Sequence, residues 1–298
     1  MKKSEILILL IIFFSITVFG QVEQSAHQIG LPLISQVNQG NSYMTFPTDI
    51  GNIEPLWFEG NIIPNFHIRQ SKDSRLMAVL TPQIILRMYR DFSYPVRTPS
   101  YIPQVTFYYL SKSTKLLNGT AFYGRLAHHS NGQDGDFFLE NGEINVISGD
   151  FSTNFFEIGI LRTGINKRLN AYQFFKSSIE IHPESWSQSE LDGIYSRCRW
   201  HNSFSIFKLP IGDSQDAKGK ANISIKGEAT WMFENYNNLN TFSAKRLNLS
   251  ITFYYHPKFL EDMGFFVQYY HGSDYYNMYF NHRLDVIRFG FMTEKLRF

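Results

Sequence analysis

The chain has 298 residues, with 28 basic and 26 acidic side chains and a formal net charge of +2, a balance that gives no reason to expect a nucleic-acid partner. Aromatic residues make up 16% of the chain, including 28 Phe and 17 Tyr, while the mean hydropathy is slightly negative at −0.23. A single cysteine, Cys198, excludes an intramolecular disulfide.

The first 20 residues have the pattern of a secretory signal peptide. Two lysines precede an apolar run at 6–19, and Gly20 provides a small residue before a plausible cleavage point. The run is too short for a membrane helix, which needs about 20 residues. We therefore expect 1–20 to be a signal peptide, 21–40 an N-terminal periplasmic segment and 41–298 the folded domain.

After the N-terminus, apolar and polar residues alternate with the period of two that β-strands produce. In 247–253 the odd positions are Leu, Leu, Ile and Phe, and the even positions are Asn, Ser and Thr. No stretch beyond the signal peptide approaches 18 uninterrupted apolar residues, which excludes a helical membrane protein. Aromatic-rich alternation predicts a barrel with an apolar outside and a polar lumen. The competing interpretation is a soluble secreted β-sandwich.

The fold class predicted by this pattern is all-β, an antiparallel transmembrane β-barrel of outer-membrane type with about 12 strands. Long and short connections alternate, as outer loops and periplasmic turns do in bacterial barrels. Such barrels have an even number of strands, with both chain termini in the periplasm. Because the sequence shows eleven runs, we expect one further strand within 41–56. Eleven runs carry the strand pattern: 60–70, 75–90, 101–111, 119–130, 152–165, 171–183, 196–209, 219–233, 244–256, 263–271 and 283–298.

The last run ends in Phe298, and a terminal aromatic residue resembles the assembly signal of outer-membrane barrels. Ile287 and Phe289 have the opposite parity, so this interpretation requires a bulge or a frayed end. On the inward face of two other runs, Arg125 and Glu157 are placed where they can pair.

The chemistry-bearing pattern lies at the end of the run 119–130. His128 and Ser130 are two residues apart, so in a strand they project from the same face. Serine needs a base to act as a nucleophile at neutral pH, and a third group can fix the tautomer of that base. Asn154, near the start of the next run, shares the same face and rim. His129 should point into the lumen, which makes it a weaker candidate for the base.

The order His-x-Ser-Asn-Gly, a polar loop and then an Asn near the next strand resembles outer-membrane phospholipase A. The segment 93–104 also resembles that family's segment before its active-site hairpin, and the match covers about 90–165. The resemblance implies a calcium-dependent hydrolase of phospholipid acyl esters, with A1 and A2 activity. It also implies a homodimer in the bacterial outer membrane, with its active site near the extracellular rim.

The resemblance assigns roles to four residues. Ser130 would attack the ester carbonyl, His128 would act as general base and then acid, and Asn154 would orient His128. The backbone N–H of Gly132 would help to stabilise the oxyanion, together with calcium-bound water.

For calcium, the matching positions are Gln133, Asp150 and, from the other subunit, Ser93. The loop is longer than is usual in the family, and Asp150 stands where a Ser is usual. Oxygen ligands suit calcium. Asp134 and Asp136 could join Asp150 as carboxylate ligands, or the three could form a solvated loop face.

Two alternatives remain at this point. A lipid A 3-O-deacylase uses a similar His-x-Ser-Asn sequence with an acidic third residue, for which Glu140 or Glu143 could be offered. Those barrels are much shorter, and Asn154 would have no role in one. The other alternative is a passive pore, in which the histidine and the serine lie at the rim without a catalytic role.

Overall fold

The computed structural model describes most of the chain from residue 29 onward. The predicted signal peptide and the terminal Phe298 lie outside the described residues. The described residues are 29–47, 49–71, 74–111, 118–208, 223–257, 259–260, 262–274, 276 and 278–293.

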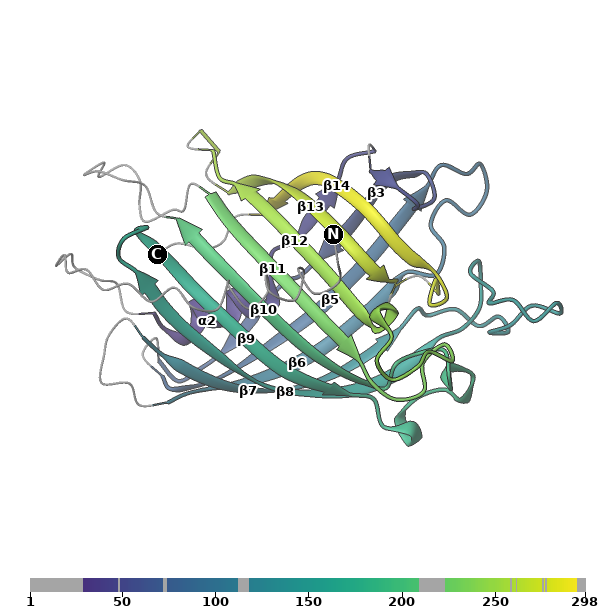
Figure 1. The fold of residues 1–298 in the computed structure, drawn as a ribbon, viewed down its shortest axis with the longest axis horizontal. Coiled ribbons are helices and arrows are strands. Elements are labelled where there is room, and N and C mark those ends of the chain that lie inside the picture. Colours follow the sequence, from purple (N-terminus) through teal and green to yellow (C-terminus); the bar gives the residue numbers. More distant parts are fainter. Residues whose placement is uncertain are drawn as a thin grey trace.

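The described strands form one continuous antiparallel sheet that wraps into a barrel (Figure 1). The strands are β1 Tyr43–Thr45, β2 Ile50–Gly51, β3 Leu56–Ile62, β4 Phe66–Ile68, β5 Leu76–Tyr89, β6 Ser100–Leu110, β7 Thr120–Ser130, β8 Ser152–Asn166, β9 Ala171–Ile181, β10 Cys198–Lys208, β11 Ile223–Met232, β12 Leu247–Tyr255, β13 Met263–Ser273 and β14 Arg283–Thr293. The described helices are α2 Leu31–Gln39, η1 Glu184–Trp186, η2 Ser189–Leu191 and η4 Ala244–Arg246.

The barrel closes through β1, which pairs with two strands far apart in the sequence. Tyr43 is in register with Met292 of β14 on one side and with Asn61 of β3 on the other. Closure leaves no sheet edge with unpaired backbone N–H and C=O groups. Lipid could not form hydrogen bonds with such groups. Together with the eleven longer strands, β1 confirms the predicted barrel of 12 strands and the additional strand within 41–56.

One predicted strand differs from the structure. The run expected at 60–70 begins earlier, as β3 at Leu56, and stops after Ile62. A short β4 then continues the pairing along β5. Pro64 lies between the two pieces, and proline has no N–H to donate to a strand ladder. The other ten predicted runs agree with strands to within a few residues wherever the chain is described.

The alternation in the sequence corresponds to the two faces of the wall. In β12, Ser250 and Thr252 are buried, whereas Ile251 and Phe253 are exposed on the outside. The outer face is therefore apolar and the lumen polar, as in barrels that span a membrane. Among the described residues, no helix has the length and apolar character needed to cross a bilayer.

Helix α2 lies inside the barrel, near the end that carries the short turns (Figure 1). Ile34 is completely buried among lumen residues, and Asn38 Nδ2 donates a hydrogen bond of 2.8 Å to the Tyr108 hydroxyl. The helix ends at Gly40, whose φ of 82° suits glycine. The long loops that follow β7, β9 and β11 lie at the opposite end of the barrel (Figure 1).

A cluster of charged side chains connects β7, β8 and β9 on the lumen side of the wall. The predicted pair is confirmed, with Arg125 Nη1 and Glu157 Oε2 separated by 2.8 Å. Lys176 Nζ lies 2.9 Å from Glu157 Oε1, and the Ser178 hydroxyl donates to the same oxygen at 2.6 Å. The Glu157 side chain is only 1% exposed, so its charge depends on these partners for compensation.

We predict that Glu157→Gln destabilises the barrel by about 3 kcal/mol, because the change removes the negative charge between two cations. Thermal unfolding, followed by the heat-modifiable shift in gel migration, would measure the effect. The control is Glu184→Gln, in which an 84% exposed carboxylate is changed and the stability should stay the same. Equal stabilities of the two variants would contradict the prediction.

Candidate active site

The predicted catalytic residues lie on the β7–β8 hairpin, at the end of the barrel that carries the long loops. In the strand register His128 faces Asn154, and Ser130 faces Ser152. Both pairs have the parity of Leu126, which is 50% exposed on the outer face. The structure therefore brings His128, Ser130 and Asn154 to one patch of the outer wall.

The imidazole of His128 is held by the neighbouring carboxamide. His128 Nδ1 lies 2.9 Å from Asn154 Oδ1, and Asn154 Nδ2 donates to the backbone carbonyl of Trp186 at 3.1 Å. Because the Asn154 amide group donates to Trp186, its oxygen accepts from His128, which places the His128 proton on Nδ1. The Nε2 atom of His128 is then the one that can accept a proton.

The loop at 131–151 is closed by Asn131, a buried residue to which sequence reasoning gave no role. Its Oδ1 accepts from the backbone N–H of Gln133 at 3.2 Å and of Phe151 at 3.1 Å. Its Nδ2 donates to the carbonyl of Gly149 at 2.7 Å. One side chain thus holds the two ends of the loop together beside the end of β7.

Gly132 follows directly with a backbone conformation that favours glycine. Its φ is 65°, and a Cβ at this position would lie 3.4 Å from the Tyr101 ring. The glycine therefore allows the chain to turn sharply after Ser130. An oxyanion role for its N–H stays a prediction.

Two of the predicted calcium ligands, Gln133 and Asp150, lie at the two loop ends joined by Asn131. The Asp150 carboxylate accepts a hydrogen bond from the Gln188 side chain. The third, Ser93, is exposed in the loop between β5 and β6. In the described part of the chain, no group of three or more His, Cys, Asp or Glu side chains is placed to hold a metal. Carbonyl and carboxylate oxygens at the loop ends fit a hard cation such as calcium.

The other candidates from the sequence lie in the lumen or in the long loop. His129 is 3% exposed and points into the lumen, with its ring centroid 4.7 Å from that of Phe151. Asp134, Asp136, Glu140 and Glu143 are exposed in the loop.

The sequence analysis gave no role to the segment at 183–188, which lies in the next long loop and contacts β8. Its Trp186 contributes a backbone carbonyl, which carries no signal in a sequence. Gln188 also accepts at its side-chain oxygen from the Ser152 N–H at 2.8 Å. The carboxamide of Asn154 therefore depends on a segment about 30 residues away.

We predict that Asn131→Ala loosens the loop, because the buried Phe151 N–H and the partly buried Gln133 N–H lose their acceptor. Limited proteolysis should cut between 133 and 150 several-fold faster, while the barrel keeps its heat-modifiable migration. The control is Asn141→Ala, at the exposed tip of the same loop, which should leave the cleavage rate nearly unchanged. Similar rates for both variants would show that Asn131 does not hold the loop.

Comparison with known proteins supports the fold. Neither the family models nor the curated proteins searched match the chain. Among solved structures, outer membrane phospholipase A from Escherichia coli is similar, with a TM-score of 0.57, 9% identity and coverage of 88% of this chain and 97% of that one. The Salmonella typhi outer membrane phospholipase dimer with bound calcium has a TM-score of 0.57 and 11% identity, over 86% of this chain and 91% of that one. At such identities the likeness shows the fold, an antiparallel barrel like that of outer membrane phospholipase A.

Proposed function

We propose that the chain is an outer-membrane phospholipase that hydrolyses the acyl ester bonds of glycerophospholipids, with A1 and A2 activity. The observation that carries this proposal is the hydrogen bond between His128 and Asn154 on the outer face, two residues from Ser130. An ordered imidazole on the same strand face as a serine two residues away supplies the base and the nucleophile that ester hydrolysis requires.

The proposed chemistry divides among four residues. Ser130 attacks the ester carbonyl while His128 Nε2 takes the hydroxyl proton and later gives it to the leaving alcohol. Asn154 keeps His128 in the tautomer that makes Nε2 basic. The N–H of Gly132 stabilises the oxyanion. A neutral amide as the third group adds no charge to a surface that faces lipid, where an unpaired charge is costly.

The surroundings of the site support a lipid substrate. Tyr101, which is in register with Ser130 on β6, is 40% exposed, and Leu126 is 50% exposed on the same outer face. Acyl chains of a membrane lipid would lie along these apolar side chains, which would bring the ester to the rim. The apolar outer wall and the fold likeness also support an outer-membrane location. We place the site at the extracellular rim because it lies at the barrel end with the long loops, which face outward in bacterial barrels.

The third member of the site favours a phospholipase over a lipid A 3-O-deacylase. His128 bonds to the carboxamide of Asn154, whereas Glu140 and Glu143 are exposed in the loop. The passive-pore alternative gives no reason for a hydrogen-bonded imidazole on the outer face.

Calcium and a second subunit form part of the proposal, because the Salmonella typhi phospholipase is a dimer with bound calcium. Gln133 and Asp150 of one subunit and Ser93 of the other would hold the ion. The bound ion would supply positive charge beside the developing oxyanion. We propose that the active form is a homodimer.

We predict that Ser130→Ala and His128→Ala each lower fatty-acid release by on the order of 10⁴-fold or more, because each removes a group that acts directly on the ester. Asn154→Ala should be milder, about a hundredfold, because it removes orientation only. The assay uses purified protein in mixed micelles and measures fatty acid and lyso-product. The control is Ser152→Ala, on the opposing strand, which should stay active. An active Ser130→Ala protein with intact barrel migration would reject the proposal.

We also predict that a calcium chelator suppresses turnover and that added calcium restores it. Asp150→Asn should raise the calcium concentration needed for half-maximal activity by about tenfold or more, because a carboxylate ligand loses its charge. Turnover during calcium titration measures both effects, with Glu140→Gln, an exposed carboxylate in the same loop, as the matched control. Full activity in excess chelator would remove the metal from the proposal.

A further inference from the structure

We propose that a chain of hydrogen bonds on the lumen side of the wall positions Asn154 on the outer side. The chain runs through Glu180, His182, Thr153 and Ser187, and it rests on the proposed function because its effect is on the orientation of Asn154. These four are positioning residues, since their side chains lie on the lumen side of the wall and do not reach the substrate.

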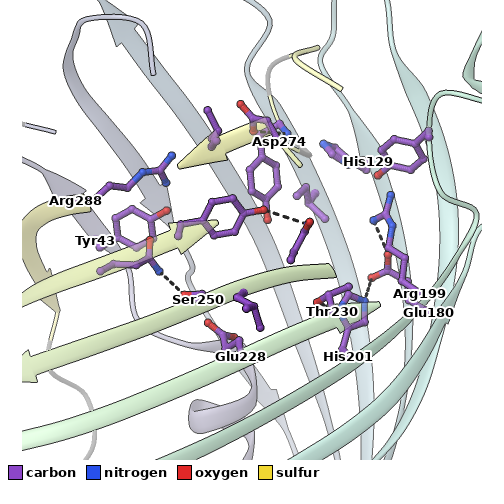
Figure 2. A pocket seen from close by; sticks show the side chains of 18 of the residues that line it. Tyr43, His129, Glu180, Arg199, His201, Glu228, Thr230, Ser250, Asp274 and Arg288 are labelled. Carbon is purple, nitrogen blue, oxygen red and sulfur yellow. Dashed lines mark hydrogen bonds and ion pairs between the residues drawn. The ribbon is translucent and has the colours of Figure 1, made fainter. Parts of the chain in front are cut away.

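The chain begins at a buried ion pair. Arg199 Nη1 donates to Glu180 Oε1 at 2.8 Å, and Figure 2 shows the two side chains together in the lumen near His129. Both line a cavity of about 300 Å³ inside the barrel. His182 Nε2 lies 2.9 Å from the same Glu180 oxygen. Glu180 is thus fixed by one partner and orients the other.

The hydrogen bonds have a definite direction. Burial lowers the pKa of the His182 imidazole to about 4, so the ring is neutral near pH 7 and has a single N–H. The carboxylate of Glu180 can only accept, which places that proton on Nε2. His182 Nδ1 then accepts from Thr153 Oγ1 at 3.0 Å. Because the Thr153 proton is used there, the Ser187 hydroxyl, 2.7 Å away, is the donor in its contact with Thr153, and it shares that proton with the Pro183 carbonyl at 3.2 Å.

Ser187 connects this chain to the segment that holds Asn154. Thr153 and Ser187 also form an isolated antiparallel bridge, and the Gln188 N–H donates to the Ser152 carbonyl at 3.2 Å. Trp186 precedes Ser187, and its carbonyl accepts from Asn154 Nδ2. A shift of Ser187 would therefore move the carbonyl that sets the orientation of the Asn154 amide.

Burial makes the connection stiff. Thr153 is 0% exposed and His182 is 2% exposed. The His182 ring packs between Phe155 and Tyr195, with ring centroids at 4.8 and 5.2 Å. Thr153 and Asn154 are neighbours on opposite faces of β8. Because the hydrogen bonds in the lumen hold Thr153 in place, they also restrict the position of Asn154 on the outer face.

The test is a double-mutant cycle with fatty-acid release as the readout. Thr153→Val keeps the side-chain shape and removes the hydroxyl, so kcat should fall about tenfold with KM unchanged, because Asn154 is no longer well oriented. In an Asn154→Ala background the same change should have no further effect. Thr153→Ser should restore activity. The matched control is Thr163→Val, a buried threonine at the other end of β8.

Ser187→Ala is a second variant, at a less buried position, and it decides the question if Thr153→Val does not fold. It should also lower kcat about tenfold, and only while Asn154 is present. Unchanged activity in a folded Thr153→Val or Ser187→Ala protein, or an equal loss with and without Asn154, would overturn the inference. Failure of the proposed function looks different, because Ser130→Ala would then stay active.

Discussion

The structure depends on the closure of a single-layered wall by β1, which bonds to both β3 and β14. With no unpaired edge, every strand residue faces either the outside or the lumen. Neighbouring residues therefore lie in different surroundings: His129 is buried in the lumen, whereas His128 lies on the outer face. The wall is thin enough for polar groups on one face to position groups on the other.

Period two was sufficient to predict most of the fold, because a wall between lipid and a polar lumen imposes that period on every strand. It failed where backbone chemistry interrupts the ladder, as at Pro64, where one predicted strand became two short ones. It also said nothing about α2. The contact between Asn38 and Tyr108 joins residues 70 positions apart, and no local pattern predicts such a pairing.

The candidate site was predictable to the extent that its geometry is local. The faces of His128 and Ser130 follow from their spacing along one strand, and that of Asn154 from the pattern of the next. Asn131 had one available signal, its position before a glycine at a turn, but its three hydrogen bonds span up to 20 residues. The Trp186 carbonyl had none, since any residue provides a carbonyl.

The use of an amide rather than a carboxylate beside His128 has a physical consequence for the rest of the wall. A carboxylate would attract the imidazole by charge, whereas an amide must be held in one of two orientations that differ in which end faces the ring. Lipid on the outer side provides no hydrogen bonds for this purpose. The orientation must therefore come from the protein, and the lumen supplies it: Thr153 links His182 to the segment that carries Trp186. On this argument a neutral third residue and a polar, ordered lumen belong together.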